Sequence, residues 1–447
     1  MSPGVANVHA SQAPGAADPM TEPTAPASGG ASSFIPDVRV PVGWTLGGLA
    51  AGLALGIVLQ GSTAAGLVLP AADVVGTLWL RGLQMTIVPL VAALLVIGIV
   101  QTVAAARAGQ LAVTALGMFA AVLATGTVFT AFAMPALLDA FPIPANAAAA
   151  LRQGLQATDP GKIPGIADFL KSVVPANIIQ AAGETAMLGV IVFFSLLALA
   201  ITRLPALHRE HLTTLFEAIT GAMLIVIGWV LKVAPLGVFA LSLTVAGASG
   251  AAALGALAHY IVCVAAMGGV VLLAAYVVAL VISRQPLGRF ARAVLPAQAM
   301  AISTQSSLAT LPTMLVACRT LGLRPTTGEL VLPLAVALFR ATGPVMNLAV
   351  AIYVTRLAGI ELTPTMLATG VVVALLTTIG SVSLPGAISF VTAIGPIALA
   401  MGVPVGPLAL LVAVEVLPDI MRTVGNVTMD VAVVAAVDRR ALSDPAS

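Results

Sequence analysis

The sequence predicts an all-α polytopic membrane protein with eight transmembrane helices and two re-entrant helical hairpins in an inverted repeat. Hydrophobic residues make up 60% of the 447 residues and charged residues only 8%, against about 25% charged residues in soluble domains. The mean hydropathy is +1.09. The apolar segments are continuous, as in transmembrane helices, and do not alternate as barrel strands do.

Six apolar segments come first along the chain, each long enough to cross a hydrocarbon core of about 30 Å. They lie at about 41–60, 74–103, 110–138, 172–203, 212–246 and 254–283. Arginine residues precede the first segment and follow the second, fourth and sixth. The positive-inside rule therefore places the N-terminus in the cytoplasm and, after eight spans, the C-terminus as well. The expected location is the cell inner membrane.

Two later stretches, 294–318 and 366–402, each hold two apolar arms around a polar centre. Arms of about ten residues reach only about 15 Å, so re-entrant hairpins fit better than kinked spanning helices, which are the alternative. The centres share the pattern Thr310-Leu311-Pro312 and Ser383-Leu384-Pro385, and one span, 328–356, separates them. The second hairpin should therefore enter from the opposite face, which is the inverted repeat of many secondary transporters.

Five polar residues share one face of the last apolar segment, 408–437. At 100° per residue they fall within a sector of about 80°, and they are Glu415, Asp419, Arg422, Asn426 and Asp430. A charged side chain at the centre of a bilayer costs about 2.5–3.5 kcal/mol even on insertion scales. We therefore expect this polar stripe to face the protein interior or a wet cavity and to form a binding site.

Several motifs make the chain resemble the glutamate-transporter homologues, the dicarboxylate/amino acid:cation symporter family, from about residue 40 to 440. The strongest match is the last helix, where Asp419, Arg422, Thr423, Asn426 and Asp430 keep the spacing of the family. The centres of both hairpins match as well. The matching segments outside the last helix are Gln84–Leu90, Val174–Asn177, Ala234–Ala240, Gln305–Pro312 and Ile379–Gly386.

The resemblance implies a role for each polar position. Asp419 would accept the α-amino group of a substrate, and Arg422 would pair with its side-chain carboxylate through a planar fork of donors. The rest of the implied substrate site consists of Thr423, Asn426, Ser306, Ser307, Ser383, Pro385 and Gly386. For each residue, a polar contact between helices without a ligand is the structural alternative.

The implied sodium ligands are Asp430, Asn426, Thr378 and Ser381. The seventh helix of the family carries Asn-Met-Asp-Gly-Thr, where this chain has Phe339-Arg340-Ala341-Thr342-Gly343. Phe339 and Ala341 supply no side-chain oxygen, and Arg340 either pairs with a carboxylate or takes the place of a bound cation. We expect weak sodium dependence, coupling to protons or exchange, and Glu415 as the protonatable group.

The resemblance also implies the domain organisation. Residues 1–38, rich in Ala, Pro, Gly and Ser, form a disordered tail. Residues 39–284 supply mainly scaffold helices 1–6, of which helices 3 and 6 could move with the transport core, and residues 285–438 supply that core. Residues 439–447 form a C-terminal tail. The family implies a homotrimer in the lipid bilayer.

The predicted function is secondary active transport of aspartate or glutamate by alternating access. A C4-dicarboxylate would leave Asp419 unpaired and a neutral amino acid would leave Arg422 unpaired, so both rank lower as substrates. A channel or sensor is a further alternative. No enzyme is expected, because the sequence has no GxSxG, HExxH or paired-cysteine motif. We expect no cofactor apart from a sodium ion and, at a net charge of +2, no nucleic-acid partner.

Overall fold

The computed structural model describes residues 42–107, 109–144, 174–249, 252–380 and 386–443. Within these ranges the chain is helical and contains no strand. The predicted N-terminal tail, 1–38, lies outside the described residues. The last helix extends to Ser443, five residues into the predicted C-terminal tail, 439–447.

Most helices follow the predicted apolar segments, but the segment predicted at 74–103 begins nine residues earlier, at Ala65, and is divided between two helices. In the first half of the chain they are α1 (Val42–Leu59), α2 (Ala65–Gln84), α3 (Ile87–Ala106), α4 (Gln110–Ala140), α7 (Ile178–Gly183), α8 (Met187–Ile201), α9 (Ala206–Lys232), α10 (Ala234–Ser249), α11 (Ala252–Val277) and the π-helical η1 (Val278–Ile282). In the second half they are α12 (Leu287–Thr304), α13 (Ser307–Thr320), α14 (Pro325–Leu338), α15 (Thr342–Leu357), α16 (Pro364–Gly380), α17 (Gly386–Ala400), α18 (Gly406–Leu411), the 3-10 turn η2 (Val412–Val414) and α19 (Val416–Ser443).

Six helical stretches of the described chain are long and apolar enough to cross a membrane, which makes the protein a multi-pass membrane protein. They are Ala65–Ala106, Gln110–Ala140, Ala206–Lys232, Leu254–Ile282, Pro325–Leu357 and Val416–Ala441. Four further apolar helices are shorter, namely Gly43–Leu59, Met187–Ile201, Ala234–Gly247 and Pro364–Ile379.

Several predicted segments are divided where a helix is interrupted. The segment predicted at 212–246 consists of α9 and α10, which meet next to Pro235. Proline has no N–H group and is favoured in the first turn of a helix, so it starts α10 instead of continuing α9. The segment predicted at 328–356 consists of α14 and α15, separated by Phe339–Ala341.

The helices pack in two sets. In the first, α1 packs on α10, α10 on α2, and α3 on α8 and α9. Gly52 and Gly56 allow α1 to approach α10 closely, because a methyl group at either position would overlap backbone atoms of α10.

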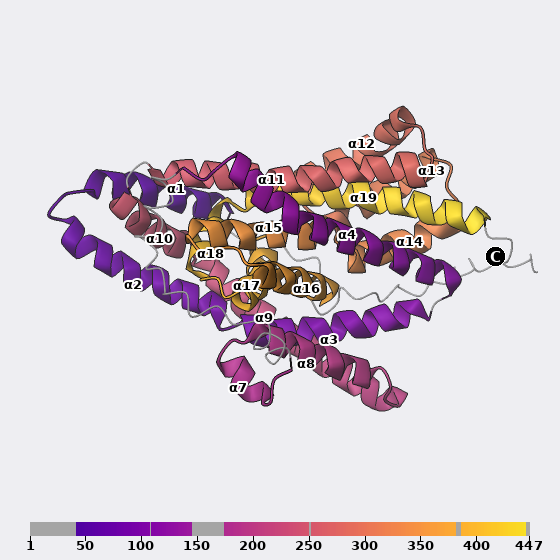
Figure 1. Ribbon diagram of the computed structural model, residues 1–447, viewed down its shortest axis with the longest axis horizontal. Helices are drawn as coiled ribbons and strands as arrows, with labels where there is room; N and C mark the ends of the chain where they lie inside the picture. The colour runs from indigo at the N-terminus through magenta and orange to yellow at the C-terminus, as the bar shows by residue number, and fades with distance from the viewer. Residues whose placement is uncertain (1–41, 108, 145–173, 250–251, 381–385, 444–447) are drawn as a thin grey trace, which may run out of the picture. The chain divides into compact units, whose positions relative to one another are not determined.

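In the second set, α19 lies beside α11 and α12, and α15 packs on α4, α11 and α16 (Figure 1). Helices α4 and α11, the third and sixth predicted spans, thus pack on the predicted transport core. An ion pair joins the ends of α4 and α15, with 2.7 Å between Arg356 Nη2 and Asp139 Oδ1. Another joins α14 to α19, with 2.8 Å between Arg324 Nε and Asp438 Oδ1.

The first predicted hairpin is formed by α12 and α13, which pack against each other. Its turn lies at Gln305, which adopts the left-handed conformation (φ 50°), and at Ser306, whose hydroxyl oxygen accepts a hydrogen bond from Ala309 N at 3.3 Å. The arms contain 18 and 14 residues, or about 27 and 21 Å. The expected length of about ten residues was therefore too short, because Arg289 and Arg292 lie inside α12 and not before it. Helices α16 and α17 pack together as the second pair.

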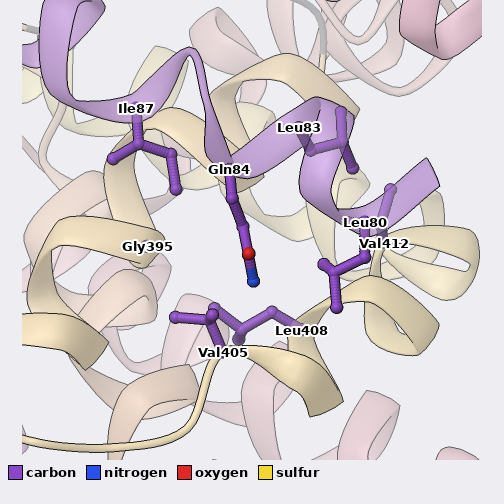
Figure 2. A pocket seen from close by; sticks show the side chains of 8 residues that line it. All are labelled: Leu80, Leu83, Gln84, Ile87, Gly395, Val405, Leu408 and Val412. Atoms are coloured by element: carbon purple, nitrogen blue, oxygen red, sulfur yellow. The ribbon is translucent and has the colours of Figure 1, made fainter. Parts of the chain in front are cut away.

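A small pocket lies between the α2–α3 junction and the segment α17–η2, and the Gln84 side chain points into it (Figure 2). The other seven lining residues are apolar. Its volume of about 20 Å³ is room for about one water molecule. It is far smaller than a small-molecule site of about 300–1,000 Å³.

Candidate functional site

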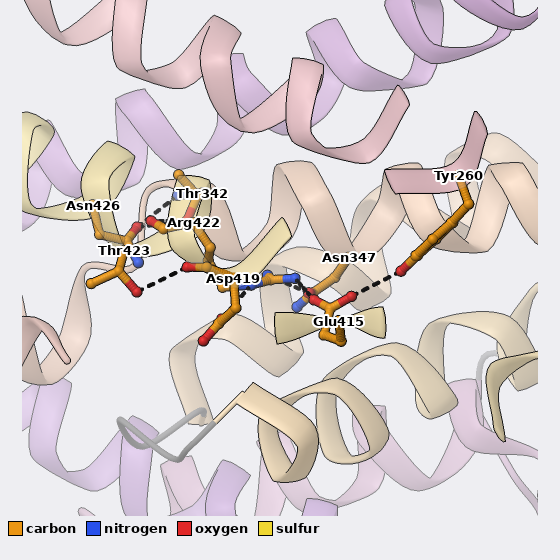
Figure 3. A network of polar contacts seen from close by, with 8 residues as sticks. All are labelled: Tyr260, Thr342, Asn347, Glu415, Asp419, Arg422, Thr423 and Asn426. Carbon is orange, nitrogen blue, oxygen red and sulfur yellow. Dashed lines mark hydrogen bonds and ion pairs between the residues drawn. The ribbon is translucent and has the colours of Figure 1, made fainter. Parts of the chain in front are cut away.

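The polar stripe, formed by Glu415 and four residues of α19, lies inside the protein, and each of its residues is at most 5% exposed. Figure 3 shows its members except Asp430. Glu415 immediately precedes α19, and Asp419 lies in the first turn, where a carboxylate is favoured by the helix dipole. A buried charge needs a partner, and the structure supplies partners from three helices.

All three nitrogens of the Arg422 guanidinium have a partner. Nη2 lies 2.7 Å from Glu415 Oε1, and Nε lies 3.2 Å from Asp419 Oδ1. Nη1 donates a hydrogen bond to Asn347 Oδ1 of α15 at 2.8 Å. A carboxylate from a substrate can therefore pair with Arg422 only by displacing one of these groups.

Glu415 is held at both carboxylate oxygens. While Oε1 pairs with Arg422, Oε2 accepts a hydrogen bond at 2.8 Å from the hydroxyl of Tyr260 on α11. Tyr260 is fully buried, and its ring meets that of Tyr353 edge to face at 5.3 Å. The carboxylate thus stays anchored to α11 even if Arg422 moves away.

Asn426 attaches the start of α15 to α19. Its Oδ1 accepts a hydrogen bond at 2.9 Å from the backbone N of Thr342, and the Thr342 hydroxyl lies 2.9 Å from the same oxygen. That hydroxyl is also 3.0 Å from the carbonyl oxygen of Arg422. The oxygen of Asn426 is therefore occupied in this conformation, and its amide nitrogen is the end that a substrate could meet.

The remaining predicted substrate residues are not all brought to the stripe. The Thr423 hydroxyl donates to Asp419 O at 3.0 Å. Ser306 caps α13, and among the described residues neither it nor Ser307 is hydrogen bonded to the stripe. Gly386 is the first residue of α17. Ser383 and Pro385 lie outside the described residues.

In the altered motif of the seventh helix, Phe339 and Ala341 make apolar contacts. Phe339 stacks on Phe119 of α4, with ring centroids 4.5 Å apart and an interplanar angle of 7°. Ala341 lines a cavity of about 460 Å³ between α4 and α11. Its lining is apolar apart from Thr125, so this cavity does not suit an acidic substrate.

The carboxylate of Asp430 is buried, and neither of its oxygens has a hydrogen-bond partner among the described residues. The positive charge of Arg340 acts on Asp430 and on Asp419. Thr378 donates its hydroxyl to Ala374 O at 2.7 Å, and Ser381 is outside the described residues. Asp430 would suit a cation, but Phe339 and Ala341 provide no further side-chain oxygen.

At positions 339 and 341, the described residues therefore supply no side-chain ligand of the kind that the resemblance implies for sodium. Within the described ranges, no group of three or more His, Cys, Asp or Glu side chains could hold a metal ion.

The model of the Sodium:dicarboxylate symporter family matches residues 42–440. The chain belongs to this family. Among similar family proteins, the Proton/glutamate-aspartate symporter of Escherichia coli (strain K12) is 29% identical over 59% of this chain and 60% of its own length. The Proton/sodium-glutamate symport protein of Bacillus subtilis (strain 168) is 26% identical over 85% of this chain and 88% of its own. The C4-dicarboxylate transport protein 2 of Polaromonas naphthalenivorans (strain CJ2) is 27% identical over 55% of each chain. The match thus spans less than two thirds of the length of the first and third of these relatives.

Sequence reasoning missed three residues of this polar cluster, Tyr260, Asn347 and Thr342. Each is a polar residue within an apolar helix, and that is the signal that could have identified it. In the structure the His259 ring nitrogens lie 3.2 Å from the Tyr353 hydroxyl and 3.0 Å from Phe141 O, which makes it a satisfied contact between helices.

Proposed function

We propose that this symporter-family protein is a secondary active transporter of acidic amino acids, aspartate or glutamate, that works by alternating access. The observation that supports the proposal is the buried cluster of Arg422 with Asp419 and Glu415. Arg422 can bind a carboxylate through parallel hydrogen bonds, and Asp419, on the same face, can accept an ammonium group. An acidic amino acid carries both groups.

A C4-dicarboxylate is the second candidate, supported by the name of the Polaromonas relative. The ranking of substrates by the charge that each would leave unpaired, made from the sequence, does not hold in the structure. Asp419 and Arg422 are paired with each other, so neither a dicarboxylate nor a neutral amino acid must leave one of these charges alone. The amino acid is preferred because a dicarboxylate would bring two further negative charges to a site that already contains Asp419 and Glu415.

We propose protons, and not sodium, as the main coupling ion, with Glu415 as the proton acceptor. This is supported by the packing of Phe339 against Phe119 and by the positive charge of Arg340 near Asp430. The predicted sodium ligands Asp430, Asn426, Thr378 and Ser381 would then hold at most a weak site, since Asn426 Oδ1 already accepts from Thr342.

For the architecture we propose eight spans, two re-entrant hairpins and a homotrimer in the inner membrane, with both termini cytoplasmic. A scaffold would hold a mobile transport core that includes α4 and α11. The support is the packing of these two helices on α15 and α19, together with the ion pair between Arg356 and Asp139.

Uptake of radiolabelled aspartate into proteoliposomes tests the function. The wild-type protein should accumulate aspartate, and Arg422→Ala should abolish its binding while leaving some affinity for small neutral amino acids. Arg319→Ala is the matched control, because Arg319 is 65% exposed and its nearest carboxylate, on Glu329, is 3.7 Å away. Unchanged aspartate affinity in Arg422→Ala would show that the assigned role is wrong.

A further inference from the structure

The Glu415–Arg422 ion pair occupies the position that a substrate carboxylate needs. Both side chains are almost fully buried, at 1% and 3% exposure, and the shortest distance between them is 2.7 Å. Glu415 is thus a competitor, built into the chain, for the side-chain carboxylate of an acidic substrate. Such competition would change the charge of the site when a substrate binds. The inference goes beyond the proposed function and rests on it.

Of the three partners of Arg422, Glu415 is the one that an incoming carboxylate should replace. Asn347 is neutral, so a substrate carboxylate that displaced it would add a negative charge while Glu415 and Asp419 both remained ionised. Asp419 is required for the ammonium group of the substrate. Glu415 also has an anchor outside the arginine, because the Tyr260 hydroxyl donates a hydrogen bond to its Oε2 at 2.8 Å.

The charges of the cluster decide what accompanies the exchange. Glu415, Asp419 and Arg422 together carry a formal charge of −1, and an acidic side chain brings this to −2. A buried carboxylate that has lost its guanidinium is costly to keep ionised. Its neutral acid is accommodated readily, since the carbonyl oxygen of a carboxylic acid still accepts the Tyr260 hydrogen bond.

The other titratable groups around Glu415 do not replace the lost charge. In the described chain, α11 contributes the Tyr260 hydroxyl, α15 contributes Tyr353 behind it, and α19 contributes Asp419 and Arg422. The charge of Arg340 acts on Asp419. None of these groups is a cation available to Glu415 once Arg422 has turned to the substrate.

We propose that an acidic substrate displaces Glu415 from Arg422 and that Glu415 takes up one proton in the same step, whereas a neutral amino acid leaves the ion pair intact and binds without a proton. The step balances, because the arginine exchanges one carboxylate for another and the proton neutralises the carboxylate that is released. Glu415 then determines both the proton coupling and the discrimination between charged and neutral substrates.

Calorimetric titration of the purified full chain tests this, with aspartate and with its uncharged isostere asparagine. Titrations at one pH in buffers of different ionisation enthalpy report the protons bound. Aspartate should take up about one proton and lose affinity about tenfold per pH unit on the alkaline side. Asparagine should bind with no proton uptake and an affinity that is independent of pH.

Two variants separate the exchange from a structural role of Glu415. Glu415→Gln should bind aspartate without proton uptake, and Glu361→Gln, which removes an exposed loop carboxylate, should behave as the wild type. Tyr260→Phe keeps the carboxylate but removes the donor that stabilises its ionised form. It should therefore retain the uptake of about one proton and move the loss of aspartate affinity to higher pH.

Aspartate that binds without proton uptake, or asparagine that takes up a proton or fails to bind at alkaline pH, would overturn this inference while leaving acidic-substrate transport intact. Failure of aspartate to bind the wild type at any pH would instead overturn the proposed function.

Discussion

Asp430 and Arg340 are the residues that bear most directly on the proposed coupling to protons instead of sodium. In the part of the chain that the structure describes, the buried Asp430 oxygens have no hydrogen-bond partner, and the charge of Arg340 acts on them from the break between α14 and α15. A permanent guanidinium near a carboxylate attracts it as a bound cation would. It also repels any sodium ion that approaches the same carboxylate.

We therefore predict that aspartate affinity depends only weakly on sodium, measured at fixed pH and ionic strength. The triple change Arg340→Met, Ala341→Asp and Phe339→Asn should create sodium dependence, because it removes the cation and adds two oxygen ligands. Arg292→Met, at an exposed arginine of α12, should leave the dependence as it was. A steep dependence of the wild type on sodium, with several ions per substrate, would contradict the prediction.

The sequence identified the residues of the site that lie on or next to α19, and not their partners on other helices. The stripe from Glu415 to Asp430 was predictable because its members are on one helix, where a period of 3.6 residues places them together. A pair of Asp419 with Arg422 follows from their spacing of three residues. Tyr260 and Asn347 reach Glu415 and Arg422 from α11 and α15, and no local pattern specifies which helices will face each other.

The close packing of α1 on α10 depends on two glycine residues, which have no side chain. Gly52 and Gly56 face α10 so closely that even a methyl group would overlap its backbone. Without a hydrophobic driving force inside the membrane, such close van der Waals packing is a main source of helix association.

We predict that Gly52→Leu destabilises the protein by about 1–3 kcal/mol through overpacking. Thermal unfolding in detergent should show a lower midpoint. Gly47→Leu is the matched control, because no atom lies within 4 Å of the position where its Cβ would be. Equal midpoints for the two variants would mean that α1 is free to move away from α10.

At the scale of elements, the sequence was more reliable for apolar length than for interruptions. Helix α4 runs from Gln110 to Ala140, close to the expected 110–138. The interruption between α14 and α15 was not expected, because Phe339 and Ala341 are compatible with a helix. It depends on tertiary contacts, namely the stack of Phe339 on Phe119 and the hydrogen bonds of Thr342 to α19.

At the scale of the whole molecule, large apolar side chains are exposed on several helices. Trp44, Leu67 and Trp229 are 79%, 82% and 61% exposed. They belong to α1, α2 and α9 of the first packing set, and in the second set Phe132 of α4 and Leu273 of α11 are 73% and 67% exposed. Exposed apolar surface of this kind faces lipid or another protein copy.

We predict that the first set provides the contacts of a homotrimer. Chemical crosslinking in native membranes should give a product of three chains, and the mass in mild detergent should agree with it. Prior denaturation should abolish the product, which is the control for random encounters. A single-chain mass in detergent, together with the absence of crosslinked species in the membrane, would exclude the trimer.

The stack of Phe119 on Phe339 affects how this lineage could change its coupling ion. Replacement of Phe339 alone by asparagine would leave an aromatic ring facing an amide, and replacement of Ala341 alone by aspartate would place a carboxylate against an apolar cavity. Each single step loses packing before any oxygen cage exists to compensate. A sodium site at this position would thus require several substitutions at once, because the aromatic pair opposes the first of them when it is made alone.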